Sequence, residues 1–139
     1  MAPPLASAGR TLFSLRVLFV AASVPALLRL DLARVQRLLE PRRARPEPSG
    51  DEIRRLVARV EQVLAAGLPL VRPGCLTRGV TLYYFLRRAG LDVRLVFGIG
   101  RPLEDLEGHC WLVREGEPFL ERKDPRPVFT ETYAIARAG

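Results

Sequence analysis

The chain has 139 residues, of which 48 % are hydrophobic, and its net charge is +7 at neutral pH. The length allows one domain with a modest core, and the hydrophobic content excludes a disordered chain. The basic balance can attract anionic partners, but no basic motif interleaved with aromatic residues is present, so nucleic acid is not expected as a partner. Two cysteines cannot build a disulfide framework, and we therefore expect a cytoplasmic protein with reduced thiols.

The N-terminal part of the chain carries most of the excess charge. Residues 1–50 hold eight arginines against three carboxylates, a net of +5. Leu12 to Leu30 is strongly apolar, but Arg16 and Pro25 leave no uninterrupted run long enough for a membrane-spanning helix. The pattern favours a helix over about residues 12–40, buried or lying on a membrane surface, rather than a signal peptide. We expect this segment to dock on a membrane surface or on a partner protein.

A change in composition divides the chain. The segment PRRARPEPSG is typical of a linker. It predicts an N-terminal helical segment with its linker, residues 1–50, followed by one folded domain, residues 51–139. Ser49 or Asp51 can cap the helix that begins this domain.

The most informative stretch is PGCLTRGVTLYYFLRRAG, in which Pro73-Gly74 prevents a helix from beginning before Cys75. Apolar residues then recur at helical spacing until Gly90, which can end the helix in the left-handed conformation. Cys75 therefore lies in the first turn, where free N–H groups and the helix dipole stabilise a thiolate. Gly79 lies one turn on, and we expect it to leave room for a substrate beside the cysteine.

The remaining pattern predicts strands, of which the second carries His109, the single histidine of the chain. The expected fold class is α+β, with helices packed on a small antiparallel sheet. The expected helices span about 12–40, 51–66 and 75–89, and the expected strands about 92–99, 109–114 and 118–123. The segment from Phe129 to Ala136 has no assigned structure.

The hairpin between the last two strands tests whether an acid can orient the histidine. A three-residue loop, Arg114-Glu115-Gly116, would pair Val113 with Glu117 and His109 with Glu121. Glu121 would then accept a hydrogen bond from one imidazole nitrogen and leave the other for Cys75.

Two further points bear on this acid. Asp124 falls on the opposite face of the strand in the three-residue register, and we keep it as the alternative third member of the triad. A two-residue turn at Glu115-Gly116 would instead place Arg122 opposite His109, which weakens the case for Glu121.

Structural and metal-binding roles for these side chains are less favoured. Cys110 points away from His109 on a strand and is expected to pack in the core. A disulfide between Cys75 and Cys110 would consume the nucleophile. A zinc site from these residues and Glu121 has the wrong ligand spacing. We therefore expect no metal and no cofactor.

The sequence resembles a known family at several motifs in the same order. These are Gly74-Cys75-Leu76-Thr77-Arg78, the helix end Leu86 to Leu91, the strand Val93 to Gly98, and His109-Cys110-Trp111. Together they resemble the transglutaminase-like cysteine proteases that remove the leader in lasso-peptide maturation. The resemblance covers about residues 51–125.

The resemblance implies a transglutaminase-like or papain-like core and a Cys-His-Asp triad. The three positions of the triad correspond to Cys75, His109 and Glu121, of which the last is glutamate where the family has aspartate. It implies as partners the precursor's leader, a small leader-recognition protein and an ATP-dependent cyclase. Trp111, two residues after the histidine, is either part of the core or, with Gly79, a substrate contact.

Two other functions use the same residues. The triad could transfer an acyl group to an amine or hydrolyse a small amide, because a cysteine acyl-enzyme accepts either water or an amine. Alternatively, the domain could be catalytically inactive and bind peptides.

Overall fold

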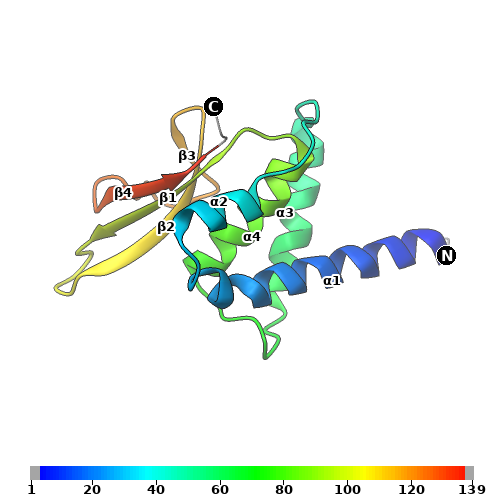
Figure 1. Cartoon of the computed structure of the whole chain (residues 1–139), viewed down its shortest axis with the longest axis horizontal. Helices are drawn as coiled ribbons and strands as arrows, with labels where there is room; N and C mark the ends of the chain where they lie inside the picture. The colour runs from blue at the N-terminus through cyan, green and yellow to red at the C-terminus, as the bar shows by residue number, and fades with distance from the viewer. Residues whose placement is uncertain (1–3, 137–139) are drawn as a thin grey trace.

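The structure, a computed structural model, describes residues 4–136, with side chains from residue 8 onward. It contains four helices and one four-stranded sheet within these residues (Figure 1). The helices are α1 (Pro4–Leu27), α2 (Leu32–Leu39), α3 (Gly50–Ala65) and α4 (Cys75–Ala89). The strands are β1 (Arg94–Gly100), β2 (Glu107–Arg114), β3 (Glu117–Phe119) and β4 (Phe129–Ile135). The predicted α+β class is confirmed.

Local signals set the helix boundaries. The side chain of Ser49 accepts a hydrogen bond from the backbone N–H of Glu52 and begins α3, as predicted. Gly90 ends α4 with φ 102°, and the N–H of Leu91 bonds the carbonyl of Leu86, as in a left-handed helix end. The expected single helix over 12–40 is wrong, because Asp31 caps a new helix by accepting from the N–H of Arg34.

The sheet lies on one side of the molecule and the helices on the other (Figure 1). Its strand order is β3-β2-β1-β4, with antiparallel pairs throughout. One face packs on α4, with Leu95 and Leu112 fully buried. The other face carries a smaller cluster around Val96, Trp111 and Val113.

The first two helices belong to the same core as the rest. Val17 of α1 and Leu39 of α2 are buried in the cluster that includes the residues of α4 and the sheet. α1 packs against both α3 and α4. Figure 1 shows α1 running past them, with its N-terminal part extending beyond the other helices. The boundary expected at residue 50 therefore falls inside one continuous core.

The hairpin register differs from the one expected. Arg114 pairs with Glu117 and Leu112 with Phe119, so the loop is the two residues Glu115-Gly116. Both have positive φ, 53° and 80°, which is the geometry of a tight hairpin turn matched to the strand twist. The three-residue loop is thus wrong, and β3 ends before it would place any residue opposite His109.

Candidate active site

Cys75 is the first residue of α4, so its thiol stands at the N-terminal end of the helix. Gly74 precedes it with φ 138°, a conformation that favours glycine, and no side chain caps the helix. The first-turn N–H groups therefore have no intrahelical partner and stay available to an oxygen of a bound molecule. The side chain of Cys75 is half-buried and lines a pocket.

His109 is held on β2, opposite Gly98 of β1. Its ring stacks on that of Phe129, the first residue of β4, with centroids 5.0 Å apart. It also stacks on Trp111 with centroids 5.7 Å apart. These two aromatic contacts fix the plane of the imidazole and leave the edge of the ring for polar partners.

Glu121 meets that edge. Its Oε2 lies 3.5 Å from Nε2 of His109, and its side chain is only 16 % exposed. It arrives there because β3 ends at Phe119 and Leu120 adopts φ 64°, a left-handed conformation that is uncommon for leucine. This bend interrupts the alternation of the strand and turns Glu121 toward β2. The contact between the acid and the imidazole is therefore present, although the strand pairing used to predict it is not.

Arg78 fixes this bend. Its Nε donates to Glu61 of α3 at 2.6 Å, and its Nη2 donates to the carbonyl of Leu120 at 2.9 Å. Its Nη1 lies 4.0 Å from Oε1 of Glu121. One guanidinium thus joins α3, α4 and the bend, and it places a positive charge behind the carboxylate that faces the imidazole. Sequence reasoning gave Arg78 no role; its position one helical turn after Cys75 was the available signal.

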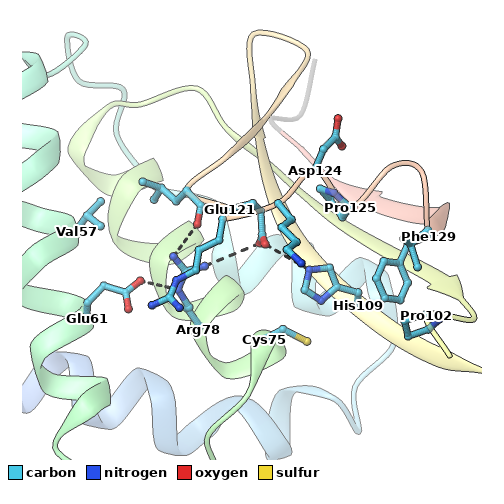
Figure 2. Close-up of a pocket in the computed structure, with 14 residues that line it drawn as sticks. Val57, Glu61, Cys75, Arg78, Pro102, His109, Glu121, Asp124, Pro125 and Phe129 are labelled. Atoms are coloured by element: carbon cyan, nitrogen blue, oxygen red, sulfur yellow. Dashed lines mark hydrogen bonds and ion pairs between the residues drawn. The ribbon is translucent and has the colours of Figure 1, made fainter.

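These side chains line one pocket of about 1060 Å³. Figure 2 shows the sulfur of Cys75 and the ring of His109 facing the same space, with Glu121 and Arg78 to one side of them. Within residues 4–136 the Cys75 thiol is free and makes no side-chain hydrogen bond. Such contacts are often loose before a substrate is bound, so the thiol and the imidazole can still meet over a substrate.

The walls of the pocket come from parts of the chain to which the sequence analysis assigned no site residues. Apolar surface is supplied by Val57 of α3, by Pro102 and Pro125 in loops, and by Val128 beside the start of β4. With a volume of about 1060 Å³, the pocket is at the upper end of the range for ligand pockets and has room for an extended peptide segment.

Asp124, the alternative acid, lines the pocket but is engaged elsewhere. Its carboxylate bonds the backbone and the guanidinium of Arg126, and these hydrogen bonds lower its pKa from the ordinary value. Figure 2 shows this carboxylate turned away from His109. The structure therefore brings Glu121 to the imidazole, and it does not bring Asp124 there.

The two expected substrate contacts lie outside the pocket. Gly79 is buried between α4 and the sheet, and a Cβ there would lie 2.9 Å from Sγ of Cys110 and 3.2 Å from Cδ1 of Leu95. Trp111 is buried on the sheet face away from α4, beneath the His109 ring. The expectation that these residues contact substrate is corrected: Gly79 allows close helix packing, and Trp111 supports the histidine.

Cys110 packs in the core, as expected from its strand position. Both cysteines are free thiols, and burial raises the pKa of Cys110 far above its ordinary value. In the described part of the chain, no group of three or more His, Cys, Asp and Glu side chains could hold a metal ion.

Comparison with known proteins gives one match. The family description "Transglutaminase-like superfamily" matches residues 17–134, which includes Cys75, His109 and Glu121. Comparisons with curated proteins and with solved structures gave no match. The matched span begins within α1 and ends within β4, so it covers the helices and the sheet as one unit. The chain belongs to the transglutaminase-like superfamily.

Proposed function

We propose that the protein is a cysteine peptidase with the triad Cys75, His109 and Glu121. The observation that carries the proposal is the contact of Glu121 with Nε2 of His109 in the pocket that the Cys75 thiol lines. An acid on one imidazole nitrogen orients the ring and leaves the other nitrogen, Nδ1, for the thiol. Thiol, base and orienting acid at one open pocket are the groups that acyl transfer requires.

The reaction follows from this arrangement. His109 takes the thiol proton on Nδ1 while the sulfur of Cys75 attacks the peptide carbonyl. The free N–H groups at the start of α4 donate to the oxygen that becomes negatively charged. The imidazolium then gives its proton to the leaving amine, and a thioester remains on Cys75. Water, deprotonated by His109, hydrolyses the thioester and restores the thiol.

The substrate we propose is the leader region of a lasso-type precursor peptide. The support is the sequence resemblance around Cys75 and His109, together with a pocket large enough for an extended chain. A small leader-recognition protein would present the precursor, and an ATP-dependent cyclase would consume the released core peptide. Both are part of this proposal.

The test is incubation of the protein with a lasso-type precursor peptide and a leader-recognition protein, followed by mass spectrometry of the products. Cys75→Ala should abolish cleavage, and His109→Ala should slow it by about 10²–10⁴-fold or more. Glu121→Gln should cost less, and Asp124→Asn should cost little. Cys110→Ala is the matched control, because it removes a thiol that does not line the pocket.

Three outcomes would change this proposal. Cleavage by the Cys75→Ala variant at the wild-type rate would refute the proposal that the protein is a cysteine peptidase. A severe loss of cleavage in Asp124→Asn with a mild loss in Glu121→Gln would show that Asp124, and not Glu121, is the third member of the triad. An amide product with an added amine, in place of hydrolysis, would identify an acyltransferase on the same residues.

A further inference from the structure

A strongly basic hollow lies on the helical side of the molecule, away from the active-site pocket. It has a volume of about 360 Å³, and five arginines line it. These residues, here called the arginine hollow, are Arg16, Arg42, Arg43, Arg45 and Arg88. No carboxylate lines it, and its floor is apolar, made by Phe13, Leu56 and Phe85.

The charges in the arginine hollow are largely uncompensated. Within residues 4–136, Arg16, Arg42, Arg43 and Arg45 form no ion pair with a carboxylate. Arg88 bonds backbone carbonyls of α2 and stacks on a tyrosine ring. Burial lowers the pKa of Arg88, and the nearby charges of Arg16 and Arg42 act in the same direction. Crowded like charges of this kind are relieved by bound anions.

An apolar ridge adjoins the hollow. It consists of Leu12, Leu15 and Phe19 on α1, whose side chains are 62 %, 57 % and 76 % exposed. Their spacing of three and four residues places them on one side of the helix. The opposite side is in the core, where Val17 and Val24 are buried. The ridge is thus an apolar surface with no partner in the described chain.

Arg16 joins the ridge to the hollow. It follows Leu12 by one helical turn and lines the arginine hollow. It also lines a second basic depression of about 590 Å³, together with Arg10, Leu12 and Arg59. Both depressions therefore lie along α1, which Figure 1 shows extending beyond the other helices.

We propose that this face docks on an anionic membrane surface, with the ridge inserted among the acyl chains and the arginine hollow holding lipid phosphates. An apolar row flanked by arginines is the arrangement that binds at a membrane interface. Ala8–Leu27, with mean hydropathy 1.4 over 20 residues, is long and apolar enough to span a bilayer by length and composition alone. Spanning would pull the buried side of α1 out of the core, so the helix lies on the surface.

The test is co-sedimentation of the full chain with phosphatidylcholine vesicles, with and without phosphatidylglycerol. Binding should require the anionic lipid and weaken as salt is added. Arg42→Gln with Arg43→Gln should lower the partition coefficient by roughly 25-fold, about five-fold for each arginine. The matched control, Arg101→Gln with Arg122→Gln, removes the same charge from the other side of the molecule and should leave binding unchanged.

The ridge is tested separately. Phe19→Gln should weaken binding by about ten-fold or more, whereas Leu103→Gln, at a residue 85 % exposed in a loop, should not. Both residues are exposed, so neither change should affect folding.

Equal binding to neutral vesicles, or wild-type binding by the Arg42 and Phe19 variants, would overturn the proposal. Binding of polyglutamate without vesicle binding would assign the hollow to acidic peptides instead, and membrane retention in alkaline carbonate would indicate a spanning helix. None of these results depends on peptidase activity.

Discussion

The contact between Gly79 and Cys110 offers a quantitative test of how closely α4 packs on the sheet. A Cβ added at Gly79 would lie 2.9 Å from Sγ of Cys110, closer than real Cβ atoms approach another atom. Overpacking of this kind costs about 1–3 kcal/mol in a well-packed core. Alanine is favoured over glycine inside a helix by about 1 kcal/mol. Gly79→Ala should therefore destabilise the protein by about 0–2 kcal/mol.

A double-mutant cycle separates the two effects. In a Cys110→Ala background the sulfur is gone, and the nearest remaining atom is Cδ1 of Leu95 at 3.2 Å, at the end of a flexible side chain. There Gly79→Ala should be neutral, or stabilising by up to about 1 kcal/mol. The coupling between the two substitutions should be about 1–3 kcal/mol, which is the overpacking cost that removing the sulfur relieves.

The measurement is urea unfolding of the four proteins, with slopes compared to confirm that the transitions are equivalent. A coupling near zero, with Gly79→Ala more stable than wild type, would refute the close approach. Cys75 lies one turn from Gly79 on α4, and His109 lies on the sheet. A different packing of α4 on the sheet would therefore also change the distance between Cys75 and His109.

Three further predictions follow from the site and the core. Arg78→Gln should lower kcat of precursor cleavage by about 10-fold or more at little change in KM, since Glu121 loses its support, and Arg78→Lys should restore only part of it. Iodoacetamide should modify Cys75 and leave Cys110 intact in the folded protein, as peptide mapping by mass spectrometry would show, because burial raises the pKa of Cys110; equal modification of both would contradict the structure. The Tyr83 hydroxyl is buried without a well-formed hydrogen bond, so Tyr83→Phe should change the free energy of unfolding by less than about 1 kcal/mol at neutral pH. Burial raises the folded-state pKa of Tyr83 above 10.0, although the charge on Arg87 opposes the shift. The contribution of the neutral phenol to the free energy of unfolding is therefore present below pH 10 and lost as the pH rises further. The free energy of unfolding of the wild type should fall at alkaline pH relative to that of Tyr83→Phe, and an equal fall in both proteins would contradict this.

The positions that could be predicted from sequence are those fixed by nearby residues. The breakers Pro73-Gly74 and the terminator Gly90 set the limits of α4, and Ser49 set the start of α3. These signals act over a few residues, so the sequence contains the whole cause. The first position of Cys75 in its helix could therefore be predicted correctly.

The approach of Glu121 to His109 could not be derived in the same way. It depends on Leu120 at positive φ, for which leucine has no preference, and on Arg78, which holds that bend from 42 residues earlier in the chain. The two-residue turn has a glutamate at a position that prefers asparagine, aspartate or glycine, so the sequence pointed to a longer loop. Glu121 lies beside His109 through this bend, and not through the strand pairing from which the contact was predicted.

β4 was missed for a related reason. Its pairing with β1 shifts between Phe97 and Gly98, and its residues alternate poorly between buried and exposed. A strand at the sheet edge with a bulge loses the period of two that identifies strands in sequence.

The uncapped start of α4 sets a limit on how the protein can be made more robust. A common way to strengthen a helix is to place serine or aspartate at the residue before its first turn. At Gly74 that change would strain a backbone with φ 138° and put an acceptor where the proposed mechanism has the substrate oxygen. Selection for heat resistance should therefore leave this glycine alone and strengthen the chain elsewhere. Among the starts of α2, α3 and α4, the one without a side-chain cap would then be the least free to change, because the proposed reaction uses its unpaired N–H groups.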